Sequence, residues 1–65
     1  MNIEFVIRDR TGHSTVLVPP EQADAKADEL RDHGYLLIVD GKLIAYGESV
    51  QQYKKVEAIP LATAG

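Results

Sequence analysis

The sequence contains no cysteine and no tryptophan, and its aromatic residues are one phenylalanine and three tyrosines. Without thiols it cannot form the disulfide framework that stabilises many small secreted domains. The absence of thiols is also typical of a cytosolic protein, so we expect a cytoplasmic location. His13 and His33 are the only imidazoles, too few for a zinc site that lacks cysteine ligands. We therefore expect no metal and no cofactor.

Long apolar runs are also missing. None reaches the roughly 18 residues of a membrane span, and the first residues lack a signal-peptide pattern. There is no glycine-rich phosphate loop or nucleophile elbow, and 65 residues leave little room for both a core and a catalytic pocket. The formal charge of −3 disfavours contact with nucleic-acid phosphates. These absences predict a protein that is not an enzyme and does not bind membranes, and they argue against a nucleic-acid partner.

The first part of the chain has the pattern of a β-hairpin. Ile3, Phe5 and Ile7 alternate with mostly polar residues, which is the period of a half-buried strand. The stretch 9–12 contains a glycine suited to a tight turn, and 14–18 is rich in β-branched residues. Two antiparallel strands joined by a short loop are the expected result.

A helix is expected over Glu21–His33, which has several alanines and no β-branched residue. Ala23, Ala27 and Leu30 recur at i, i+4 and i+7, so they form a narrow apolar stripe. Gly34 follows the helix and can adopt the left-handed conformation that ends many helices.

A second hairpin is expected over Tyr35–Val39 and Lys42–Tyr46. Asp40 and Gly41 between these two strands form the dipeptide that favours a type I′ turn. Both strands are almost continuously apolar, whereas a strand with one solvated face usually alternates.

The last part of the chain predicts one more strand. Ser49 is expected to cap a single helical turn that extends through Tyr53, and Val56–Leu61 has the composition of a strand. We therefore predict one domain over residues 1–61 and a flexible tail over residues 62–65. With only one helix available, that helix is expected to cover one face of the sheet.

This succession of elements resembles the β-grasp fold, and one segment resembles the middle of ubiquitin. Leu37–Lys42 has the Leu-Ile strand and Gly-Lys turn, and Gly47, Ser49, Val50 and Tyr53 follow at matching spacing. The resemblance implies an α+β, ubiquitin-like β-grasp fold of order β-β-α-β-β-(short helical turn)-β, with one helix packed on a mixed sheet. It also implies a largely buried Tyr53 ring whose hydroxyl bonds to the backbone. The chain departs from ubiquitin at its end, where the Gly-Gly tail is absent.

The apolar second hairpin suggests a binding surface on the sheet face away from the helix. If Leu37 points to the helix, alternation directs Leu36 and Ile38 to the opposite face. Alternation across the turn leaves two alternatives, either Leu43 with Ala45 outside or Ile44 with Tyr46 outside. By the resemblance, Ile38 matches the centre of the surface through which ubiquitin binds its partners. The residues predicted to bind a partner protein are Val6, Leu17, Leu36, Ile38 and Leu43.

These features favour a non-enzymatic protein-interaction module, an adaptor or a small inhibitor. One alternative is a homodimer formed through the same sheet face or through an edge strand. Another is a C-terminally activated modifier or sulfur carrier, for which only Gly65 argues. The last is an acidic helix face that mimics DNA, as in inhibitors of mobile-element origin, formed by Asp24, Asp28, Glu29 and Asp32.

Overall fold

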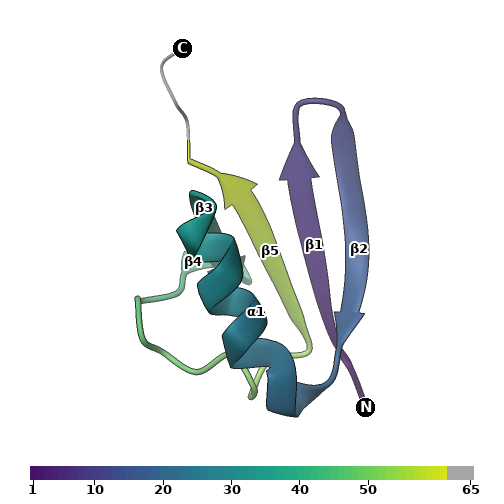
Figure 1. Cartoon of the computed structure of the whole chain (residues 1–65), viewed down its shortest axis with the longest axis vertical. Coiled ribbons are helices and arrows are strands. Elements are labelled where there is room, and N and C mark those ends of the chain that lie inside the picture. Colours follow the sequence, from purple (N-terminus) through teal and green to yellow (C-terminus); the bar gives the residue numbers. More distant parts are fainter. Residues whose placement is uncertain (62–65) are drawn as a thin grey trace.

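The computed structural model describes residues 1–61, so the tail predicted over residues 62–65 lies outside the described residues. Five strands and one helix follow one another along the chain (Figure 1). They are β1 (Ile3–Asp9), β2 (Gly12–Val18), α1 (Pro20–Asp32), β3 (Tyr35–Val39), β4 (Lys42–Leu43) and β5 (Lys55–Pro60). The predicted helix and both predicted hairpins are present.

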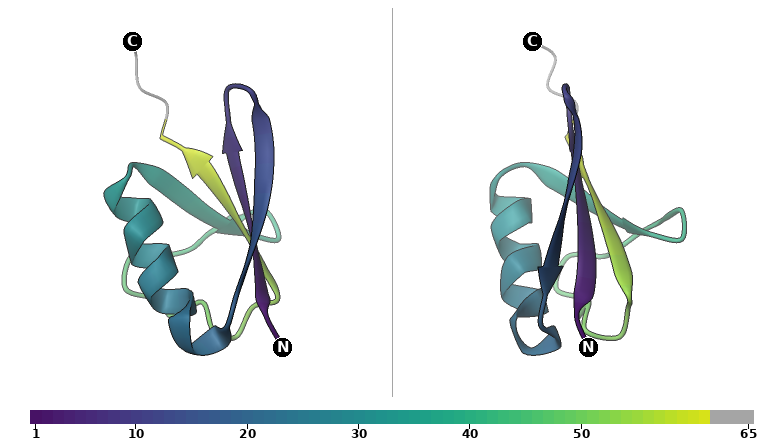
Figure 2. Two further views of the ribbon diagram at one scale, coloured as in Figure 1. Left: turned by 45° about the vertical axis from the view of Figure 1, so that its right-hand side comes forward. Right: turned by 90° about the vertical axis from the view of Figure 1, so that its right-hand side faces the viewer.

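The strands form one mixed sheet of order β2-β1-β5-β3-β4. β1 and β5 run parallel at its centre, and every other neighbouring pair is antiparallel. The helix lies on one face of the sheet and leaves the opposite face uncovered (Figure 2). The protein is therefore a small α+β fold, and this arrangement is compatible with a β-grasp-like architecture.

The two tight turns adopt the backbone conformations that their residues favour. Asp40 and Gly41 have φ angles of 52° and 78°, and the type I′ turn requires both to be positive. In the first hairpin, the Asp9 carboxylate accepts hydrogen bonds from the side chain and backbone N–H of Thr11, each at 2.8 Å. These two bonds stabilise the charged carboxylate and lower the pKa of Asp9.

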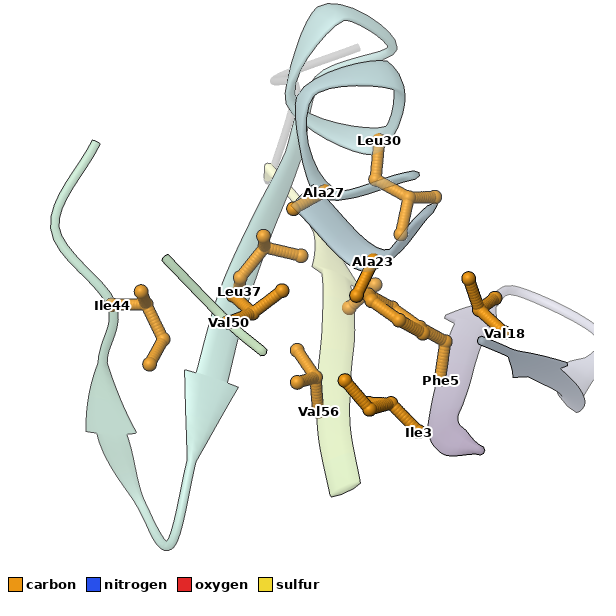
Figure 3. Packing of buried hydrophobic residues seen from close by; sticks show 11 residues of the cluster. Ile3, Phe5, Val18, Ala23, Ala27, Leu30, Leu37, Ile44, Val50 and Val56 are labelled. Carbon is orange, nitrogen blue, oxygen red and sulfur yellow. The ribbon is translucent and has the colours of Figure 1, made fainter. Parts of the chain in front are cut away.

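The core lies between the helix and the sheet (Figure 3). Phe5, Leu37, Val50 and Val56 are the largest of its fully buried side chains. The helix contributes small residues from its predicted stripe, which let its backbone approach the sheet closely. Apolar groups from four strands, the helix and the segment before β5 thus share one cluster.

The prediction that the fourth strand extends to Tyr46 is wrong, because β4 ends at Leu43. Beyond it, the Ile44 N–H still donates to the Leu37 carbonyl at 2.9 Å. The Ala45 carbonyl then accepts from the Arg31 guanidinium at 3.0 Å, and that guanidinium lies 5.2 Å from the Tyr46 ring centroid. A contact with the helix therefore draws the chain out of the sheet.

The single helical turn predicted from Ser49 through Tyr53 is also wrong. The structure has a hydrogen-bonded turn here, in which the Tyr53 N–H donates to the Val50 carbonyl at 3.1 Å. Ser49 directs its hydroxyl to the carboxylate of Asp24 on the helix, at 3.0 and 3.2 Å from the two oxygens. The same carboxylate accepts the Val50 N–H at 2.8 Å, so a long-range contact fixes the segment.

Tyr53 departs from the expectation of a largely buried ring. It is half-buried at the edge of the core, and its hydroxyl donates to the Glu48 carboxylate at 2.7 Å and not to the backbone. The carboxylate stabilises the protonated phenol, and this bond, followed by desolvation, raises the pKa of Tyr53.

Replacing Glu48 with glutamine is expected to lower the pKa of Tyr53 toward its ordinary value of 10.0. In the parent protein the raised pKa adds stability that is fully present below pH 10.0 and is lost as the pH rises through the folded-state pKa. Phenolate absorbance during an alkaline titration measures the change, with Tyr53→Phe identifying the signal among the three tyrosines. An identical Tyr53 titration in parent and Glu48→Gln would contradict the assignment.

Candidate functional site

The sheet face away from α1, called the open face below, carries alternate residues of each strand. The pairing registers place the open-face residues beside one another in rows across the sheet. One row runs from Thr15 through Val6 and Glu57 to Ile38 and Leu43. This arrangement shows which apolar side chains are true neighbours on the surface.

Four apolar side chains lie together at one end of the open face and are called the apolar cluster: Leu36, Ile38, Leu43 and Ile59. Ile38 pairs with Leu43, and Leu36 pairs with Ile59, so the four form two adjacent rows. Leu43 is 63% exposed and Leu36 is 38% exposed, while Ile38 and Ile59 are half-buried. Three strands, β3, β4 and β5, thus present a continuous apolar surface to solvent.

The register decides between the two alternatives for the fourth strand. Leu43 pairs with Ile38 and therefore shares the open face with it. Ile44 lies opposite Leu37 and is 7% exposed in the core. Leu43 is thus the outward residue.

Val6 and Leu17 do not join the apolar cluster. Val6 is on the open face but only 6% exposed, so little of its side chain is accessible to a partner. It lies on an inner strand between Thr15 and Glu57, whose side chains stand on either side of it. Leu17 is 62% exposed, but it stands on the edge strand β2 beside Glu4 and away from the cluster.

Charged residues occupy the middle of the open face. The Arg8 guanidinium donates to the Glu57 carboxylate at 2.8 Å, joining β1 to β5. The hydrogen bond from Arg8 lowers the pKa of Glu57. Glu4 and Lys55 lie next to each other in the adjacent row. The apolar cluster is therefore bordered by charged residues, of which Arg8 and Glu57 form an ion pair.

The acidic residues of the helix do not form a uniform array. Asp24 accepts hydrogen bonds from the segment before β5, and its carboxylate is directed into the fold. Asp28 lies 3.7 Å from Arg31, and Glu29 lies 3.5 Å from Lys26, so two more of the charges have basic neighbours. Asp32 is exposed at the end of the helix. Gly65, the residue on which the modifier alternative depends, lies outside the described residues.

The two histidines lie apart. His13 is exposed on β2, and the His33 Nδ1 lies 2.8 Å from the Glu29 carbonyl at the end of the helix. Across residues 1–61, no three histidine, aspartate or glutamate side chains gather as metal ligands would.

Sequence reasoning missed one member of the apolar cluster, Ile59. The signal was available, because Val56 and Ala58 are core residues of one strand and alternation directs Ile59 to the other face.

Comparison with known proteins adds no relative: no family model, curated protein or solved structure matches the chain. The one helix of the described part is too short and too polar to cross a membrane.

Proposed function

We propose that this protein is a non-enzymatic interaction module that binds a partner protein through the apolar cluster on its open sheet face. The observation that carries the proposal is the contiguity of Leu36, Ile38, Leu43 and Ile59 on the side of the sheet that no helix or strand within residues 1–61 covers. Exposed apolar area costs roughly 25 cal/mol per Å² relative to burial, so covering the cluster with a partner lowers the free energy of the complex.

The finer fold assignment, a ubiquitin-like β-grasp, belongs to the same proposal. It is supported by the sheet order β2-β1-β5-β3-β4, by the parallel central pair and by the helix between β2 and β3. By the resemblance, Ile38 corresponds to the centre of ubiquitin's partner-binding surface, and here it adjoins Leu43 in the cluster. The lack of thiols supports a cytoplasmic place of action.

The chemistry of the cluster indicates the kind of partner it suits. The cluster itself carries no charge, and the neighbouring Arg8 and Glu57 already neutralise each other at 2.8 Å. A partner surface that is apolar at its centre and polar at its rim fits such a site. Because apolar contacts respond little to ionic screening, binding should persist in high salt.

Changing Leu43 to aspartate is expected to abolish recovery of the partner in a pull-down from the native host, because a charge would be desolvated at the interface. Leu17→Asp is the matched control: the two leucines share a face and are 63% and 62% exposed, but Leu17 stands on the opposite edge strand. Circular dichroism should show that both variants fold. Equal recovery by parent and Leu43→Asp would contradict the proposal.

Salt separates this proposal from the acidic-helix alternative. Binding through the carboxylates of Asp28 and Glu29 should weaken steeply as the screening length falls from about 10 Å at 0.1 M to about 3 Å at 1 M salt. Loss of the partner at 1 M salt, together with normal binding by Leu43→Asp, would indicate that the partner binds the acidic helix face and not the apolar cluster.

A further inference from the structure

The outer edge of β2 is a seven-residue stretch with free hydrogen-bonding capacity. Asp9 pairs with Gly12 across a two-residue loop, which makes this pair the closing hydrogen-bonded pair of the hairpin. Alternation from that pair turns the backbone N–H and C=O groups of His13, Thr15 and Leu17 away from β1. Within residues 1–61 these groups have no backbone partner on their outer side.

This edge also lacks the features that usually prevent a strand from pairing with another chain. Gly12–Val18 contains no lysine, arginine, aspartate or glutamate, no proline and no bulge in its register with β1. All of its residues except Val18 are exposed, and four of the seven are β-branched or leucine. Edge strands of this length without such features are prone to pair with other strands.

A groove of about 480 Å³ runs beside the edge, between β2 and α1. Val16 and Val18 form its strand wall, and Gln22, Ala25, Lys26 and Glu29 belong to its helix wall. A strand added to β2 would direct its helix-side residues into this groove. The helix wall carries one cation and one anion, so it presents no net charge to an incoming strand.

We propose that β2 pairs antiparallel with β2 of a second copy across a two-fold axis at Thr15. This inference is independent of the proposed function, because the apolar cluster lies on β3, β4 and β5. Thr15 then faces its own counterpart, and His13 faces Leu17 of the other copy at both ends. Each of these pairs exchanges two backbone hydrogen bonds, and no like charges oppose one another.

The side chains of this arrangement are complementary as well. On the helix side Ser14 lies opposite Val16 of the other copy, so each serine reaches the strand wall of its neighbour's groove beside a valine that is 37% exposed in the single chain. A two-fold axis at Leu17 is disfavoured, because it would place Pro19 opposite Thr15 and proline has no N–H to donate. The axis at Thr15 keeps the hydrogen-bonded residues within β2 of both copies.

Sedimentation equilibrium tests the pairing. Protein concentrations up to about 1 mM allow a dimer with a dissociation constant as weak as about 1 mM to be detected. The parent is expected to approach twice its monomer mass of 7.2 kDa. Thr15→Lys should remain monomeric, because it places two like charges opposite each other at the axis. Leu36→Asp, a change on the open face at the other side of the sheet, should still dimerise.

Single cysteines test the register, since the chain has none of its own. Across a hydrogen-bonded pair the Cα atoms lie about 5.5 Å apart, within disulfide range, so Thr15→Cys should form a covalent dimer on mild oxidation. Ser14→Cys is the matched control, because its two copies would be diagonal neighbours about 7–8 Å apart. A parent that stays at 7.2 kDa, loss of the dimer in Leu36→Asp but not in Thr15→Lys, or faster cross-linking by Ser14→Cys would each overturn the proposal.

Discussion

Phe5→Ala is expected to remove most of the stability of this fold. Phe5 is fully buried on the inner strand β1, where it pairs with Val16 on one side and Val56 on the other. In Figure 3 its ring lies beneath Ala23 of the helix. Truncating a buried phenylalanine costs about 3–5 kcal/mol, and a domain of this size has a total stability of only about 3–10 kcal/mol.

Thermal unfolding followed by circular dichroism measures this effect. Each kcal/mol shifts Tm by roughly 4–8 °C in a small domain, so Phe5→Ala should lower Tm by at least about 10 °C or abolish the cooperative transition. Leu17→Ala is the control, because Leu17 is a large apolar residue that is 62% exposed on the neighbouring strand. Its replacement should change stability by no more than about 0.5 kcal/mol. A similar Tm for Phe5→Ala and the parent would contradict the described core.

The elements that local sequence determines could be predicted from the sequence. The Asp40-Gly41 dipeptide specifies positive φ at both positions, which are observed, and the stripe of Ala23, Ala27 and Leu30 is the buried side of the helix. In both cases the information lies within a few consecutive residues. The strands and the helix that these local signals predict occur in the structure in the predicted order.

The errors arose where residues distant in sequence decide the local structure. The fourth strand ends early because Arg31 bonds the Ala45 carbonyl, and nothing near Ala45 in the sequence indicates that contact. In the segment after Ser49 the carboxylate of Asp24, 26 positions before Val50, accepts the Val50 N–H, a contact that no residue near Ser49 in the sequence indicates. Such contacts become visible only once the helix is placed on the sheet.

Only part of the candidate site could be predicted, because the rest depends on contacts between strands that are distant in sequence. Alternation placed Leu36 and Ile38 together, but only the register across the Asp40-Gly41 turn determines that Leu43 joins them. The burial of Val6 depends on its neighbours across two different strands, which alternation along one strand does not reveal. Which open-face side chains are exposed could therefore be determined only once the pairing of all the strands was known.

Asp24→Ala is the second change expected to destabilise the protein markedly, although Asp24 was expected to belong to a solvated helix face. Its carboxylate accepts the Val50 N–H at 2.8 Å and lies 3.0 Å from the Ser49 hydroxyl. These bonds hold the segment that delivers the Val50 side chain, which is fully buried, to the core. Losing charge-assisted bonds and leaving a donor without its partner costs about 1–3 kcal/mol.

Chemical denaturation gives the free energy of unfolding of Asp24→Ala, and amide hydrogen exchange at Val50 shows where stability is lost. Asp28→Ala is the matched control: it lies one turn further along the same helix, and within residues 1–61 its carboxylate has one ion-pair neighbour, Arg31 at 3.7 Å. Exposed pairs of this kind contribute little, so the control should change stability by less than about 1 kcal/mol. If the Val50 amide exchanges equally slowly in Asp24→Ala and the parent, the carboxylate does not hold this segment. If both variants lose equal stability, the loss comes from removing a negative charge from the helix, because of these two carboxylates it is that of Asp24 that is hydrogen-bonded to Ser49 and Val50.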